Sequence, residues 1–193
     1  MRNFKLWFEN SESNPIIFLD LDETLISTLK LPSNTKNVDE LISLGGIPVD
    51  DSYISFLRPH ANEFINKMKS IAKTCILTAG SRAFQPKAIK ALNIPIEDNH
   101  IFCIEDYDLD FIRPKDNKLP KNKNSVLVDD LDYTAGKTMA KLYAIGIDED
   151  RHIKVNPFNF NPILARKLPR FYKNDDELLN IESAVINILK GKS

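Results

Sequence analysis

Apolar runs of four to six residues recur along the chain, and most are followed by segments with helical spacing of their apolar residues. The first run, Ile16 to Leu19, is continuous, which is typical of a strand buried on both faces. Similar runs predict further strands at 73–78, 99–104 and 125–128. Because parallel strands joined by helices produce this alternation, the pattern predicts an α/β fold with a mainly parallel sheet.

Apolar residues at helical spacing predict the connecting helices. One helix starts near Pro59, a second contains Ala88 and Leu92, and a third covers about 133–143. We expect Gly146 to end the third helix, since glycine readily adopts the left-handed conformation found after helices. A last amphipathic helix is predicted at about 175–190, with its apolar residues on one face.

One stretch interrupts the alternation. Residues 27–52 are mostly polar, and only 38–44 has a helical pattern. The stretch also contains the turn-forming residues Pro32, Gly45, Gly46 and Pro48. We interpret it as a flap or small insertion. The expected organisation is therefore an N-terminal extension at 1–14 and a single domain at 15–193 that contains this insertion.

Composition narrows the functional classes. A length of 193 residues with 42% hydrophobic residues suits one domain with a substantial core. The net charge of -1 gives no general preference for nucleic acid or membranes. No segment approaches the ~18 apolar residues that a membrane span needs. Cys75 and Cys103 lie in apolar runs and are interpreted as small buried hydrophobic residues in a reducing compartment. We therefore expect a soluble intracellular protein, cytoplasmic or nuclear, without a membrane partner.

Paired acidic residues follow two of the predicted strands. Asp20 and Asp22 come directly after the first strand, and Asp129 and Asp130 follow the run at 125–128. Because parallel strands end at the same edge of a sheet, Asp20 and Asp129 should face each other there. Carboxylates held this close require a compensating cation, and Mg2+ prefers oxygen ligands. With the ion bound, one aspartate could attack phosphorus while the next transfers the proton.

A site for phosphoryl transfer also needs groups that hold the phosphate. Thr78 ends a predicted strand and is followed by Ala79 and a turn into a helix, where a hydroxyl and free backbone N–H groups could bind phosphate oxygens. Fixed positive charge is needed as well. The most basic stretch, 113–123, precedes the strand at 125–128 and is expected to supply one inward-pointing lysine.

These segments resemble a known family. Asp20-Leu21-Asp22-Glu23-Thr24 resembles motif I of the haloacid dehalogenase (HAD) superfamily, hydrophobic-Asp-x-Asp-x-Thr. In the form DLDETL it is most similar to the Fcp/Scp-like, or NIF-like, group that includes the RNA polymerase CTD phosphatases. Thr78-Ala79-Gly80 resembles that group's Thr-Ala-Ser, Phe84-Gln85-Pro86 stands where the group often has Tyr-Ala-x-Pro, and Val128-Asp129-Asp130 resembles its Val-Asp-Asp or Val-Asp-Asn.

The chain departs from the group's pattern at several positions. His60 replaces a glycine after Arg58-Pro59, and Gly80 replaces a serine. Leu131-Asp132-Tyr133 stands in place of the usual Ser-Pro. The distance along the sequence from the basic stretch to Asp129 is also slightly short. The identity of the lysine is therefore the least defined part of the predicted site.

The resemblance implies a HAD-like, Rossmannoid three-layer α/β/α fold without a large cap domain. It implies that Asp20 becomes an aspartyl-phosphate while Asp22 protonates the leaving group and later activates water. Mg2+ would be held by the Asp20 and Asp129 carboxylates and by the backbone carbonyl of Asp22.

The remaining roles also follow from the resemblance. Thr78, Ala79 and Lys115 would bind the phosphate. Lys115 is chosen because Lys115-Asp116 resembles the group's Lys-Asp-Leu, with Lys121 as second choice and Lys118 a further possibility. Thr24 would steady the turn after Asp22, and Asp130 would support the metal ligands.

The short gaps between motifs leave no room for a large cap, and an open site favours a macromolecular substrate. By resemblance, we expect a Mg2+-dependent protein phosphatase that acts on phosphoserine or phosphothreonine. The basic stretch 113–123 leaves a polynucleotide 3'-phosphatase or nucleotidase as an alternative. A non-catalytic phosphate- or protein-binding module on the same fold is the other alternative, although Asp20, Asp22, Thr78 and Asp129 are all present.

Overall fold

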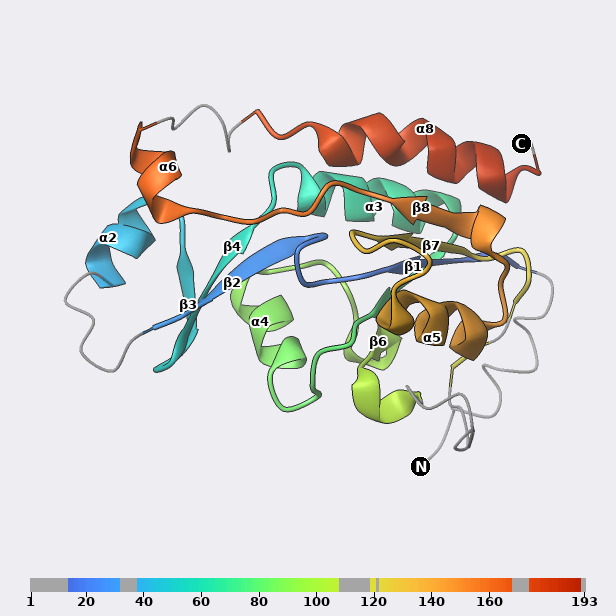
Figure 1. The fold of residues 1–193 in the computed structure, drawn as a ribbon, viewed down its shortest axis with the longest axis horizontal. Helices are drawn as coiled ribbons and strands as arrows, with labels where there is room; N and C mark the ends of the chain where they lie inside the picture. The colour runs from blue at the N-terminus through green and yellow to red at the C-terminus, as the bar shows by residue number, and fades with distance from the viewer. Residues whose placement is uncertain (1–13, 32–37, 108–118, 121, 168–173, 192–193) are drawn as a thin grey trace.

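A parallel sheet forms the centre of the computed structural model, which describes residues 14–31, 38–107, 119–120, 122–167 and 174–191. Its five strands are arranged in the order β6-β5-β1-β7-β8 (Figure 1). The strands are β1 (Ile16–Leu19), β5 (Lys73–Leu77), β6 (Ile101–Phe102), β7 (Val126–Asp129) and β8 (His152–Lys154). All four neighbouring pairs are parallel, which confirms the predicted mainly parallel sheet.

Helices cover both faces of this sheet. The principal helices are α3 (Ala61–Ile71), α4 (Gln85–Ala91), α5 (Gly136–Ile145) and α8 (Glu177–Leu189). Helices α3 and α8 lie on one face and α5 on the other (Figure 1). Gly146 ends α5 with a φ of 69°, as predicted. The predicted three-layer α/β/α fold is therefore confirmed.

The continuous apolar runs are explained by burial on both faces of the sheet. Successive side chains of a strand point to opposite faces. Ile17 and Leu19 accordingly join the core under α3 and α8, while Ile16 and Phe18 join the core under α5. All four side chains are buried. A strand in the middle of such a sheet has no face for polar residues until it reaches the edge, where Asp20 follows.

A second, antiparallel sheet occupies much of the stretch interpreted as an insertion. Its strands are β2 (Ile26–Lys30), β3 (Ile47–Asp50) and β4 (Tyr53–Leu57), in the order β2-β4-β3. The short helix α2 (Val38–Ser43) lies at the predicted place, whereas the strands were not predicted. Ile54 and Phe56 pack with Phe158 and Phe160 in a small core of their own, and Phe56 stacks on Phe160 with ring centroids 3.7 Å apart.

Several elements differ from the sequence prediction. Strand β6 covers only two residues, because the 3-10 helices η1 (Asp98–His100) and η2 (Ile104–Asp106) flank it within the predicted 99–104 strand. A third 3-10 helix, η3 (Glu149–Arg151), precedes β8. Strand β8 and helix α6 (Pro162–Lys167) had no counterpart in the prediction.

The cysteines are buried and free, as predicted. Burial raises the pKa of Cys75 to about 12 and that of Cys103 to about 11, so both thiols stay protonated and unreactive. No helix within the described part of the chain has the length and apolar character to cross a membrane. Residues 1–13 of the predicted N-terminal extension lie outside the described residues.

Candidate active site

The predicted acidic residues meet at the carboxyl end of the central strands. Asp20 follows β1 and Asp129 is the last residue of β7. The two strands are neighbours, and the Asp20 N–H donates to the Val128 carbonyl at 2.8 Å. From β1 the chain first reaches β5 and β6 on one side and then β7 and β8 on the other. The aspartates therefore lie at the switch point of strand order, where α/β sheets bind ligands.

Three buried carboxylates form a cluster that could hold a metal ion. One oxygen from each of Asp20, Asp129 and Asp130 lies within 4.8 Å of the others. Their side chains come from the ends of two adjacent strands, so the backbone fixes their separation. An all-oxygen set of ligands fits a hard divalent cation such as Mg2+. Asp20 and Asp129 are therefore placed as the prediction requires, and Asp130 is close enough to support them.

A lysine that was not predicted connects this cluster. Lys141 Nζ on α5 donates to Asp20 Oδ1 and Asp129 Oδ2, each at 2.6 Å. The Lys141 residue is only 1% exposed. One buried ammonium group with two carboxylate partners balances only part of their negative charge. The site therefore contains fixed positive charge at the predicted nucleophile.

Burial dominates the electrostatics of the cluster. It raises the pKa of Asp20 to about 7; Lys141 opposes this shift, and the charge of Asp129 adds to it. Burial, with the charge of Asp129, also raises the pKa of Asp130. Burial alone would lower the pKa of Lys141, but the Asp20 and Asp129 carboxylates hold it above its ordinary value. Burial makes ionisation of these carboxylates costly, and the single ammonium group of Lys141 offsets only part of that cost. The cluster therefore favours binding of an added cation.

Asp22 points to a different set of partners from Asp20. Its Oδ2 accepts a hydrogen bond of 2.6 Å from Gln85 Nε2 and one of 3.4 Å from Thr78 Oγ1. Burial raises the pKa of Asp22, whereas the hydrogen bonds from Gln85 and Thr78 lower it. The next residue, Glu23, has a φ of 61°, a left-handed conformation that turns the chain sharply away. Asp22 is thus held beside the carboxylate cluster but separately from it.

Thr24 and Thr78 support the two acidic strand ends. Thr24 Oγ1 donates to Asp130 Oδ1 at 3.2 Å, which ties the turn after Asp22 to the end of β7. Thr78 is buried, and its Oγ1 accepts a 3.0 Å hydrogen bond from the Gly80 N–H. Thr24 thus contacts Asp130 and Thr78 contacts Asp22, while the predicted roles of both threonines stay predictions.

The site opens into a hollow of about 280 Å3. Its lining combines the acidic strand ends, the turn after β5 and one face of α5: Asp20, Asp22, Glu23, Thr78, Ala79, Gly80, Asp130, Leu131, Lys137 and Lys141. Thr78 and Ala79, the predicted phosphate-binding residues, thus face the same space as the predicted nucleophile.

The predicted lysines are not placed by the structure. Lys115, Lys118 and Lys121 lie outside the described residues, so their role stays a prediction. Lys141 had a signal in the sequence that could have revealed it. It lies three residues after Thr138 and four before Ile145, on the helix face that is buried. A lysine within an apolar stripe requires a buried acidic partner, and Asp129 was the nearest candidate.

Comparison with known proteins agrees with this geometry. Residues 15–193 match the family model described as NLI interacting factor-like phosphatase. This match confirms the resemblance inferred from the motifs. No curated protein sequence matches the chain.

Two solved structures share the fold. The first, Fcp1, "an essential RNA polymerase II CTD phosphatase", has a TM-score of 0.60 and 15% identity over 97% of this chain and 65% of its own. The second, fission yeast RNA polymerase II CTD phosphatase Fcp1-R271A bound to beryllium fluoride, has a TM-score of 0.50 and 16% identity over 98% of this chain and 54% of its own. This chain therefore spans between half and two thirds of their length.

Proposed function

Because the chain belongs to the NLI interacting factor-like phosphatase family, we propose that it is a Mg2+-dependent phosphatase that uses Asp20 as its nucleophile. The observation that carries the proposal is the buried contact of Lys141 with both Asp20 and Asp129 at the switch point of the sheet. An ion pair on the surface would carry little information, whereas charged groups buried together at the ligand-binding edge of a sheet are typical of functional sites.

The residues of the cluster fit a magnesium ion. The Asp20 and Asp129 carboxylates and the backbone carbonyl of Asp22 would hold it, with Asp130 alongside. When bound, Mg2+ offsets the negative charge that the phosphoryl group brings to these carboxylates. Lys141 contributes a second, permanent positive charge next to Asp20, so that an anionic nucleophile and an anionic substrate can approach each other.

The side chains divide the reaction into two steps. An Asp20 oxygen forms a bond to phosphorus as the bond to the leaving oxygen breaks, and Asp22 donates its proton to that oxygen. Asp22 then takes a proton from water, whose oxygen attacks the aspartyl-phosphate and releases inorganic phosphate and free Asp20. Thr78 and Ala79 line the same hollow as Asp20, which supports our proposal that the Thr78 hydroxyl and the Ala79 N–H bind the phosphoryl oxygens during both steps.

For the substrate, we propose a phosphoserine or phosphothreonine segment of a protein. Both structural neighbours are RNA polymerase II CTD phosphatases, which supports this choice. The small antiparallel sheet β2-β4-β3 would act as a flap rather than a cap, in a single domain at 15–193. The stretch 113–123, which suggested a nucleic-acid substrate, lies largely outside the described residues, so that alternative stays a prediction.

Hydrolysis of an aryl phosphate with and without Mg2+ tests the proposal. The chain should be active only with the metal, and Asp20→Asn should be inactive. Beryllium fluoride should bind at Asp20 of the wild-type protein and should not bind to the Asp20→Asn variant. Equal trace rates for both proteins would refute the phosphatase assignment and leave the non-catalytic alternative. A phosphopeptide compared with a 3'-phosphorylated oligonucleotide then separates the two substrate classes.

A further inference from the structure

Gln85 makes the shortest hydrogen bond to Asp22. It is the first residue of α4 and is only 3% exposed. Its Nε2 lies 2.6 Å from Asp22 Oδ2, whereas the Thr78 hydroxyl lies 3.4 Å from the same oxygen. A bond to a carboxylate at the shorter distance is charge-assisted and much the stronger of the two. Gln85, not Thr78, therefore fixes the orientation of the Asp22 carboxyl group.

The burial of this amide has a cost that packing alone does not explain. Gln85 Oε1 is buried and has no hydrogen-bond partner among the described residues. A buried acceptor without a hydrogen-bond partner destabilises the folded state. An apolar side chain of the same length would avoid that cost at this position. A glutamine here is therefore explained by its contact with Asp22.

Gly80 provides the space for this contact. A Cβ atom at position 80 would lie 1.9 Å from Gln85 Nε2, 2.6 Å from its Cδ and 2.7 Å from its Cγ. Any other residue at position 80 would displace the amide group. This requirement gives a physical reason for glycine where the Thr-Ala-Ser pattern has serine.

We propose that Gln85 is a positioning residue that holds the Asp22 carboxyl group toward the leaving oxygen, and that Gly80 is required to make room for it. The inference rests on the proposed phosphatase function, since it assigns Gln85 a role in the proton transfer made by Asp22. Gln85 itself touches no reacting atom. Its removal should therefore weaken proton donation more than binding of the phosphoryl group.

Leaving groups of different basicity test this role. A nitrophenolate leaves readily without a proton, whereas a methoxyphenolate depends more on the acid. In Gln85→Met, which keeps length without a donor, kcat/KM for methoxyphenyl phosphate should fall at least about tenfold, the equivalent of one hydrogen bond to a charged group. For nitrophenyl phosphate the loss should be less than about threefold on the same grounds.

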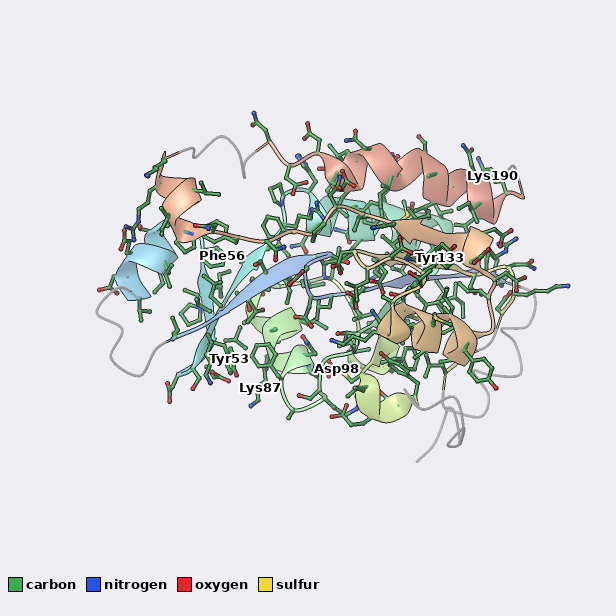
Figure 2. The ribbon with its side chains drawn as sticks, viewed as in Figure 1. Tyr53, Phe56, Lys87, Asp98, Tyr133 and Lys190 are labelled. Carbon is green, nitrogen blue, oxygen red and sulfur yellow. The ribbon has the colours of Figure 1, made fainter. Side chains whose placement is uncertain are left out.

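Lys87→Met provides the matched control. Lys87 is on the same helix, and its side chain is exposed at the outer side of α4 (Figure 2). This variant should hydrolyse both substrates at the wild-type rate. Equal losses on the two substrates in Gln85→Met would overturn the positioning role. If the wild-type protein hydrolyses neither substrate, the underlying phosphatase function is refuted, and the inference with it.

A double-mutant cycle tests the link to Gly80. Gly80→Ala and Gln85→Ala should each lower kcat/KM for methoxyphenyl phosphate by about tenfold or more, since each removes the bond to Asp22. The double variant should be no worse than either single variant, because the added methyl group then has space. If the losses in kcat/KM of the two single variants multiply in the double variant, Gly80 acts independently of Gln85, and this part of the proposal is overturned. Circular dichroism checks that all four proteins are folded.

Discussion

Lys141 is the residue on which the site most depends. It lies on the buried face of α5 and is the shared partner of two carboxylates from different strands. Removal of one member of such a group leaves the others buried and uncompensated, which costs about 3–5 kcal/mol. The same removal takes away the positive charge next to the proposed nucleophile. Activity and stability should therefore both respond to this position.

We predict that Lys141→Met lowers the rate of aryl phosphate hydrolysis by at least about 100-fold, the scale of losing one electrostatic stabiliser of a transition state. It should also lower the free energy of unfolding by about 3 kcal/mol, as measured by urea denaturation. Lys115→Met is the comparison, because Lys115 is the lysine favoured by sequence resemblance. If Lys115→Met abolishes activity and Lys141→Met does not, the assignment to Lys141 is wrong.

His152 makes stability depend on pH. Burial lowers its pKa below the ordinary value of 6.5, with Asp129 and Asp132 opposing the shift, and its Nε2 is buried with no hydrogen-bond partner in the described part of the chain. The folded protein thus keeps this imidazole neutral while the unfolded chain takes up a proton near its ordinary pKa. Unfolding is therefore favoured as the pH falls through 6.5 and below.

The variant His152→Leu removes this titration. The variant should become more stable relative to the wild type as the pH is lowered from neutral toward 5.5: its free energy of unfolding minus that of the wild type should rise, because the other titrating groups are common to both proteins. Urea denaturation of both proteins at several pH values measures the difference. A constant difference across this range would show that the folded state does not hold His152 neutral.

At the scale of elements, Arg58 joins three segments that are distant in sequence. It follows β4 and is 2% exposed. Its Nε donates to Asp175 Oδ2 and its guanidinium NH1 donates to the Thr24 carbonyl, both at 3.1 Å. The guanidinium also lies over the ring of Phe158 at 5.6 Å. The start of α8 is thus connected to the turn that follows Asp22.

We predict that Asp175→Ala lowers the free energy of unfolding by about 3 kcal/mol, because the Arg58 charge is left buried without its carboxylate. The neighbouring Asp176 is exposed, and among the described residues its carboxylate pairs only with His60. Asp176→Ala should therefore cost less than about 1 kcal/mol. Thermal or urea unfolding measures the free energy lost in each variant. A loss in Asp175→Ala as small as that in Asp176→Ala would mean that water reaches Arg58 in the variant.

Strands buried on both faces were predictable from the sequence, and half-exposed strands were not. Strands β1, β5 and β7 are continuous apolar runs because helices cover the sheet on both sides. Strand β3 is mostly exposed and contains Pro48 and Asp50, so its composition indicated a loop. Strand β4 has a partly apolar run in Tyr53–Leu57 that was overlooked between turn residues. Tertiary packing, rather than local preference, forms the small sheet.

The same distinction applies to the site. Asp20 and Asp129 were predictable because strand ends have a fixed place in a parallel sheet. Lys141 was missed because a lysine in a helix is ordinarily solvated, and only the face of α5 that meets the sheet reveals its burial. Gln85 required contact information of another kind, since its role depends on the absence of a side chain at Gly80.

At the scale of the whole molecule, the small antiparallel sheet contacts the part of the central domain that contains α4. The central sheet provides Asp20 and Asp129, while the small sheet β2-β4-β3 has its own core and contacts α4 at its side. Tyr53 of β4 meets Phe84, the residue before α4, edge to face at 5.0 Å. Since Gln85 follows Phe84, the small sheet helps to fix the helix that orients Asp22.

Metal binding should stabilise this whole arrangement. The acidic cluster is assembled only when β1 and β7 are paired, so the proposed Mg2+ ion would bind the folded chain and not the unfolded one. A ligand present at 100 times its Kd adds about 2.7 kcal/mol of stability. For a domain of this size that is a rise in Tm of roughly 5–10 °C. We predict such a rise on addition of Mg2+ and its reversal by a chelator, as measured by thermal unfolding.

Asp129→Asn should abolish this rise, because it removes a buried carboxylate ligand while it keeps the shape of the side chain. Asp132→Asn is the matched control: Asp132 lies three residues further along the same loop and is exposed, so the Mg2+ effect should persist. A rise that survives in Asp129→Asn would place the cation elsewhere on the acidic surface. Lys141 pairs with Asp129, so Asp129→Asn also weakens this ion pair. The Tm of the variant without Mg2+ reports the stability lost with the ion pair. The change in Tm on addition of Mg2+ reports metal binding by the acidic cluster.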